Sequence, residues 1–157
     1  YLFMTGDELP YEAVSRHQVE ALIGEKLDED IPIEEVIAAA AESWHLFFLI
    51  PDPQRRQRCE KRWRDLLGDQ VICMDAPSNA CAVAAGIVAL TEKAVPDLGA
   101  LVQLMGSHGM AGDRVSAVAH ALESYAEVID PGKPRRARPS ASSGTPVRSS
   151  WWKRLFG

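Results

Sequence analysis

The chain has 157 residues, of which 46% are hydrophobic and 25% charged, the composition of a soluble globular protein long enough to bury a core. Its longest uncharged apolar run, residues 80–90, is too short to span a bilayer, and no charged-then-apolar pattern opens the chain, so we expect a cytoplasmic protein. Residues 1–130 hold 10 basic and 22 acidic residues, a net charge of −12, whereas residues 131–157 hold seven basic and no acidic residues. An acidic body of this kind repels phosphates, so nucleic acid is not the expected partner.

Two strand-and-helix segments open the chain. Residues 1–5, YLFMT, have the pattern of a strand buried on both faces. The next helix is predicted to start with Ser15 as its N-cap and Gln18 three residues on, a capping-box pattern. The apolar residues at helical spacing predict its inner face, made of Val19, Leu22, Ile23 and Leu27. A second helix is predicted from Pro32, with one apolar side ending at Trp44.

The run of five apolar residues at 46–50 is the strongest fold signal. A strand is apolar without alternation only when both of its faces are covered, as in a parallel sheet between helices. Pro51 ends this strand, and the following helix is predicted to reach Leu67, with Asp52 as its cap and Pro53 in its first turn. The apolar residues of that helix, Trp63 among them, are expected to face inward. Residues 71–74 predict a third strand. The order of elements indicates an α/β fold with a doubly wound parallel sheet of three strands.

The rest of the chain is predicted to be helical and then irregular. Three helices are expected, at residues 79–93, 98–105 and 113–129. The first is rich in small residues, which should let it lie close against the sheet. We therefore expect an α/β domain with a helical extension over residues 1–130. Residues 131–150, rich in proline, serine and arginine, are predicted to be a flexible linker, and residues 151–157 an aromatic and basic tail motif.

Three acidic residues follow the three predicted strands. Asp7, Asp52 and Asp75 should meet at the carboxyl edge of a parallel sheet, where such folds bind ligands. Converging carboxylates are suitable ligands for Mg²⁺, which prefers oxygen atoms. The ordinary alternative is that Asp52 caps a helix and that Asp7 and Asp75 belong to turns, and for Asp52 and Asp75 this alternative is favoured.

Two arginines stand in the first turn of the helix after Asp52. Positive charge at that position opposes the helix dipole, so Arg55 and Arg56 are expected to have compensating contacts. Either they pair with Asp7, Glu8 or Asp75, or together with Asp75 they bind an anion or a partner. Internal pairing or simple solvation is the favoured alternative.

The tail motif is a candidate docking element. Exposed aromatic side chains beside basic groups have a cost unless they contact something. The candidate docking residues are Trp151, Trp152, Lys153, Arg154 and Phe156. Docking on an acidic protein, or on the acidic body of the same chain, is favoured over contact with an anionic membrane or with single-stranded nucleic acid.

The segments YLFMTGDELPY, HLFFLIPD, CEKRWRDLLGD and VICM, in this order, resemble the second half of a von Willebrand factor type A domain of the kind found in bacterial intracellular proteins. The resemblance covers about residues 1–75 and implies a doubly wound α/β sheet. In that family a Thr-Asp-Gly-like turn after a strand supplies one acidic residue of a metal-ion-dependent adhesion site. The matching turn here is Thr5-Gly6-Asp7-Glu8, in a different order, with Asp7 as the candidate metal ligand. The family's other ligands, an Asp-x-Ser-x-Ser loop and a later threonine, belong to the half that would precede Tyr1.

The resemblance implies a binding role rather than catalysis. A divalent cation such as Mg²⁺ would complete its coordination with an acidic residue of a protein partner, and the domain would be a scaffold or regulator. The alternative is a Mg²⁺-dependent phosphohydrolase or nucleotide-binding domain in which Asp7, Asp52 and Asp75 act with Arg55 and Arg56 on a phosphate. No nucleophile or catalytic-base motif supports that alternative. A structural domain without a ligand is the third interpretation.

Overall fold

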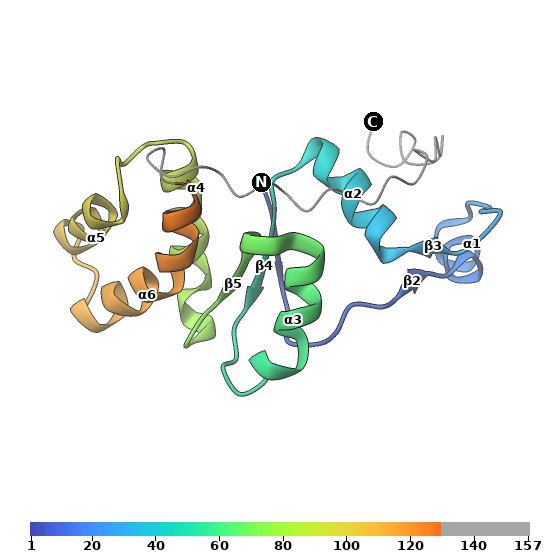
Figure 1. Ribbon diagram of the computed structural model, residues 1–157, viewed down its shortest axis with the longest axis horizontal. Coiled ribbons are helices and arrows are strands. Elements are labelled where there is room, and N and C mark those ends of the chain that lie inside the picture. Colours follow the sequence, from blue (N-terminus) through green and yellow to red (C-terminus); the bar gives the residue numbers. More distant parts are fainter. Residues whose placement is uncertain (130–157) are drawn as a thin grey trace. The chain divides into compact units, whose positions relative to one another are not determined.

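The computed structural model describes residues 1–129, which form two compact units: Tyr1–Pro10 together with residues 45–129, and Tyr11–Trp44 (Figure 1). The strands are β1 (Leu2–Thr5), β2 (Ala13–Val14), β3 (Ile31–Pro32), β4 (Leu46–Ile50) and β5 (Val71–Cys73). The α-helices are α1 (Arg16–Ile23), α2 (Ile33–Ser43), α3 (Arg56–Leu67), α4 (Ala80–Thr91), α5 (Leu98–Ser107) and α6 (Gly112–Ile129). Two short 3₁₀ helices, Gly68–Gln70 and Pro77–Asn79, precede β5 and α4.

The first unit is built on a three-stranded parallel sheet in the order β1-β4-β5. Leu2 of β1 is level with Leu46 of β4, and Phe48 of β4 is level with Val71 of β5. The central strand is the predicted apolar run, and all five of its residues are buried. The prediction of an α/β fold with a parallel sheet of three strands is thus confirmed.

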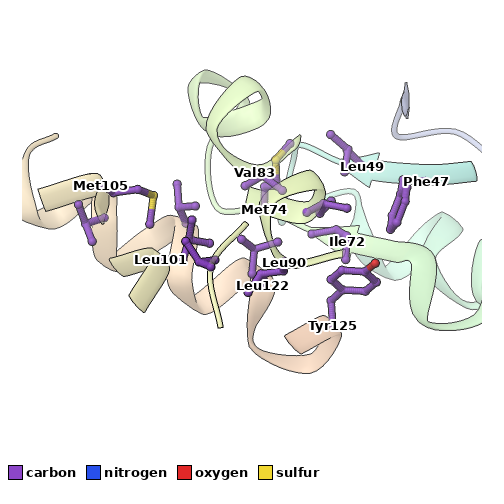
Figure 2. Close-up of a cluster of buried hydrophobic side chains, with 14 residues drawn as sticks. Phe47, Leu49, Ile72, Met74, Val83, Leu90, Leu101, Met105, Leu122 and Tyr125 are labelled. Atoms are coloured by element: carbon purple, nitrogen blue, oxygen red, sulfur yellow. The ribbon is translucent and has the colours of Figure 1, made fainter. Parts of the chain in front are cut away.

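Helices cover both faces of this sheet, as a strand without alternation requires. On one face Phe48 stacks on Trp63 of α3, which contacts both β4 and β5. On the other face Phe47 and Leu49 belong to a buried cluster shared with α4, α5 and α6, and Phe47 meets the edge of the Tyr125 ring (Figure 2). Successive β4 residues therefore serve opposite layers of the core.

The prediction of a strand buried on both faces was wrong for β1. The strand is the outer one of the sheet, Leu2 is 38% exposed, and Phe3 and Met4 are only half-buried. Its apolar run resembles that of β4, but an outer strand in a sheet has a neighbour on one side only. A pattern of residue types does not distinguish these two positions.

The last three helices pack against one another around a glycine. A Cβ atom on Gly86 of α4 would lie 2.6 Å from Leu122 Cδ1 and 3.1 Å from Leu101 Cδ2. Both leucines are buried, and both belong to the cluster in Figure 2. The small residues were predicted to bring this helix close to the sheet, whereas the close approach at Gly86 is to α5 and α6.

The second unit pairs two strands of two residues each, β2 with β3, in antiparallel register. Ser15 stands at the predicted N-cap of α1, but its side chain accepts no capping hydrogen bond. Asp30 Oδ1 accepts the hydrogen bond from the Arg16 backbone N–H instead, at 2.9 Å, and Arg16 Nη1 donates to the Asp28 carbonyl. A carboxylate 14 residues away therefore replaces the predicted local cap.

The predicted inner face of the first helix is largely not buried. Val19 is 8% exposed, but Leu22 is 84% and Ile23 is 55% exposed. No residue of α2 is buried, although the apolar residues of α2 follow helical spacing as predicted. Helical spacing shows which side of a helix is apolar, but burial needs a second surface over that side.

No helix within residues 1–129 is long and apolar enough to cross a membrane. The predicted linker at 131–150 and the tail motif at 151–157 lie outside the described residues, so their predicted roles stay predictions.

Candidate charged site at the carboxyl edge of the sheet

The loop after β1 lies beside the carboxyl end of β4. The two strands are parallel, and the Gly6 backbone N–H donates a hydrogen bond of 3.2 Å to the Leu49 carbonyl. The Thr5-Gly6-Asp7-Glu8 turn is thus fixed at the edge where ligand sites of parallel sheets are expected.

Arg55 binds both acidic residues of this turn. Its Nε lies 3.3 Å from Asp7 Oδ2, and its Nη1 donates a hydrogen bond of 2.8 Å to Glu8 Oε1. We call Asp7, Glu8 and Arg55 the carboxyl-edge cluster. The favoured prediction of internal pairing is confirmed for Arg55.

Trp63 holds the same turn from the α3 side. Its indole Nε1–H donates a hydrogen bond of 2.9 Å to the Glu8 carbonyl, and its ring stacks on Phe48 with centroids 3.8 Å apart. The sequence predicted Trp63 to face inward, which it does at 8% exposure. Its contact with Glu8 was not predicted, because helical spacing shows the side that a tryptophan faces but not the partner of its N–H.

Gly6 explains the unusual order of the turn. A Cβ atom at this position would lie 3.1 Å from Phe48 Cζ, tighter than most contacts of real Cβ atoms. The glycine therefore leaves room for the Phe48 ring, which also stacks on Trp63. With Asp and Gly exchanged, the aspartate side chain would start against that ring.

Arg56 has a different partner from Arg55. Its Nε donates to Glu60 Oε2 at 2.5 Å, and Arg64 Nε donates to Glu60 Oε1 at 2.7 Å, all within α3. The hydrogen bond that Arg56 donates to the Glu60 carboxylate raises the pKa of Arg56, and the charge of the exposed Asp75 acts in the same direction. The two predicted arginines therefore do not converge on one ligand position.

The Glu60 carboxylate gives a pH-dependent prediction. Hydrogen bonds from Arg56 and Arg64 lower the pKa of Glu60 from its ordinary 4.5 to about 2. Because the folded pKa is the lower one, the carboxylate stabilises the fold above about pH 4.5, and this contribution disappears as the pH falls toward 2. We expect Glu60→Gln to lower the free energy of unfolding by about 1–2 kcal/mol at neutral pH. Urea titrations at a series of pH values should show this difference shrinking below pH 4.5; a difference independent of pH would contradict the assignment.

Asp52 was predicted to cap the helix directly. It instead caps the turn that precedes the helix. Its Oδ1 accepts a hydrogen bond of 2.8 Å from the Gln54 backbone N–H, and its carbonyl accepts from the Arg55 and Arg56 N–H groups. The helix begins at Arg56, so Pro53 lies in this turn and not in the first turn of α3.

The residues present do not fit a divalent cation by themselves. Asp7, the candidate ligand, already faces the Arg55 guanidinium. Within residues 1–129, no group of three or more histidine, cysteine, aspartate or glutamate residues is placed to hold a metal ion.

The second unit has a polar hollow of its own. An open depression of about 450 Å³ is lined by Arg16, His17, Glu29 and Asp30. Arg16 and Asp30 are already joined by the backbone hydrogen bond that starts α1. The hollow has none of the residues predicted for a site.

Fold and site together define an α/β protein with a parallel sheet and an internally paired charge cluster at its carboxyl edge. Comparison with protein-family models, with characterised proteins and with solved structures gave no match. The predicted docking residues Trp151, Trp152, Lys153, Arg154 and Phe156 lie outside the described residues.

Proposed function

We propose that the protein is a non-enzymatic protein-interaction or regulatory module of the von Willebrand factor type A kind, with the carboxyl-edge cluster as its contact face. The observation that carries the proposal is the binding of Asp7 and Glu8 by one arginine, at the edge where the resemblance places the family's contact site. The resemblance in residues 1–75 and the parallel sheet support it.

The pairing of the cluster suits recognition better than catalysis. The side chain of Arg55 is 45% exposed, so its guanidinium is held in one orientation while part of it still faces solvent. A group held in this way presents fixed hydrogen-bond donors to a partner's carboxylate. Phosphate chemistry requires arginines free to meet a phosphate and a defined base, and among residues 1–129 both candidate arginines are bound to carboxylates.

The interaction test compares two charge reversals, one at the residue just before α3 and one within α3. Arg55→Glu removes the centre of the cluster, whereas Lys61→Glu makes the same charge change at a side chain that is 92% exposed. Proteins retained from a lysate of the source organism by the immobilised chain should be lost with Arg55→Glu and kept with Lys61→Glu. Equal retention by both variants would reject the cluster as the contact face. Mg²⁺-dependent phosphate release from ATP or p-nitrophenyl phosphate, abolished by Arg55→Glu, would reject the non-enzymatic role.

The metal dependence implied by the resemblance gives a prediction for Arg55. Because Asp7 faces the Arg55 guanidinium and does not fit a divalent cation by itself, the wild-type chain should bind Mg²⁺ only weakly. Removal of the guanidinium in Arg55→Ala is expected to strengthen that weak Mg²⁺ binding about three- to tenfold. The free energy of unfolding should change by less than about 1 kcal/mol, because the pair is partly exposed. Isothermal titration with MgCl₂ measures the effect, and the double variant Asp7→Asn with Arg55→Ala is the control. If Arg55→Ala binds Mg²⁺ no more tightly than the wild-type chain does, the assignment of Asp7 as a metal ligand is rejected.

A further inference from the structure

The negative charge of the described residues is concentrated in the second unit. Residues 11–44 hold nine acidic and two basic residues, a net charge of −7 on 34 residues. The described residues of the first unit, 1–10 and 45–129, hold 12 acidic and eight basic residues, a net charge of −4 on 95 residues. Like charges at this density repel one another, and a cationic ligand relieves that repulsion.

The two most exposed large apolar side chains among residues 1–129, Tyr11 and Leu22, are in the same unit, which also exposes Ile23 and Trp44. Tyr11 is 89%, Leu22 84%, Ile23 55% and Trp44 43% exposed. Only Val19 and Ile31 are buried in residues 11–44, and a segment of 34 residues is too small to build a core of its own. Exposed apolar surface surrounded by charge is typical of a binding surface.

The tail of the chain has the complementary chemistry. Residues 131–157 carry seven basic and no acidic residues, which balances the −7 of residues 11–44. In residues 151–157 the apolar residues are at positions 151, 152, 155 and 156, and the two basic ones are at 153 and 154. This spacing is that of an amphipathic helix with one aromatic face, the kind of segment that binds an apolar surface rimmed by acids.

We propose that residues 11–44 form the docking surface for residues 151–157 of the same chain. Trp151, Trp152 and Phe156 cover the exposed apolar side chains of α1, while Lys153 and Arg154 face the surrounding carboxylates. The 21 residues from 130 to 150 span at most about 70 Å when extended, which lets residues 151–157 reach surfaces far from the end of α6. Attachment to the same chain makes docking intramolecular, which favours it over a free partner of equal affinity. The proposal does not depend on the proposed function.

Zero-length carbodiimide cross-linking of the full chain tests the contact directly, because Lys153 is the one lysine in residues 151–157. We expect cross-links from the Lys153 amine to Glu25, Asp28 and Glu29, detected by mass spectrometry in the monomer band. Lys153→Arg keeps the charge and should abolish these cross-links. A mixture of ¹⁴N- and ¹⁵N-labelled protein separates the two sources of a cross-link: peptides of mixed label would show docking between two copies and overturn the proposal.

Hydrogen exchange tests the apolar part of the surface. In Trp151→Ala with Trp152→Ala, the amides of α1 and α2 should exchange at least about fivefold faster than in the wild-type chain. The control is the double variant Arg135→Ala with Arg136→Ala, which removes two cations outside the docking segment. In this variant the amides of α1 and α2 should exchange at nearly the wild-type rate. On the acceptor side Leu22→Ser should reproduce the effect of the tryptophan variants, whereas Leu104→Ser, at another exposed leucine (43%), should not.

Three further results would overturn the proposal. One is exchange in α1 and α2 that does not respond to the tryptophan variants. The second is a set of Lys153 cross-links that favours acids of the first unit, such as Asp65 or Glu123. The third is binding of the wild-type chain to vesicles of anionic phospholipid that is lost with Trp151→Ala and Trp152→Ala, without any Lys153 cross-link to residues 11–44.

Discussion

Replacement of Trp63 by alanine is expected to lower the free energy of unfolding by about 3–5 kcal/mol, because it removes a buried ring from the α3 face of the sheet. The ring stacks on Phe48, and its N–H holds the Glu8 carbonyl. The variant therefore loses apolar burial, the aromatic contact and the anchor of the turn after β1 at the same time. Urea unfolding followed by circular dichroism measures the loss.

Trp63→Phe is the matched control for this prediction. Phenylalanine keeps a ring against Phe48 but has no N–H for the Glu8 carbonyl, so about 1 kcal/mol should be lost through the hydrogen bond, plus a part for the smaller ring. If the turn positions the carboxyl-edge cluster, Trp63→Phe should also weaken the retention of partner proteins more than its loss of stability explains. Equal losses in the alanine and phenylalanine variants would contradict the stacking contribution.

The second large effect is expected in the packing of α4 against α6. Leu122 is fully buried, and Leu122→Ala should lower the free energy of unfolding by about 2–5 kcal/mol, since it leaves a cavity in the cluster of Figure 2. Gly86→Ala should also destabilise the wild-type chain, because the added Cβ would lie 2.6 Å from Leu122 Cδ1.

The two changes together should not be additive. With Leu122 reduced to alanine, its Cδ1 atom is gone, and the remaining close atom, Leu101 Cδ2 at 3.1 Å, can shift slightly into the cavity. Gly86→Ala then adds a methyl group to the cavity and gains helix propensity of about 1 kcal/mol. We therefore expect Gly86→Ala to stabilise the Leu122→Ala chain while it destabilises the wild-type chain. A double-mutant cycle measured by urea unfolding decides this, and the same sign in both backgrounds would refute the close approach at Gly86.

The carboxyl-edge cluster changes the meaning of the predicted site. The sequence placed acids after the strands and arginines after Asp52, and each appears at that edge. Three acids around a cation were one predicted arrangement, and pairing of the arginines with nearby acids was the favoured one. The structure has Asp7 and Glu8 on Arg55, and Glu60 on Arg56, so the charges are distributed over two separate pairs of contacts.

Local sequence patterns were sufficient to predict those elements whose own residues show a clear apolar spacing. The uninterrupted run at β4 predicted a central buried strand, and the helical spacing in α3 predicted that Trp63 faces inward. Local sequence patterns were insufficient to predict contacts between two segments that are distant in the sequence. The two-residue strands β2 and β3 are too short to show alternation, and the cap of α1 comes from Asp30 rather than from Ser15.

The sequence by itself determined the α/β class, the central strand, most helix positions and the separation of acidic body from basic tail, because each depends on residue type and short-range spacing. Only the tertiary structure decided that β1 is an outer strand, that Gly6 leaves room for Phe48, and that Arg55 pairs with both Asp7 and Glu8. The physical reason is distance along the chain: Arg55 and Glu8 are 47 residues apart, and Trp63 and Glu8 are 55 apart. Folding brings these partners together through the parallel pairing of β1 with β4, which no local pattern specifies.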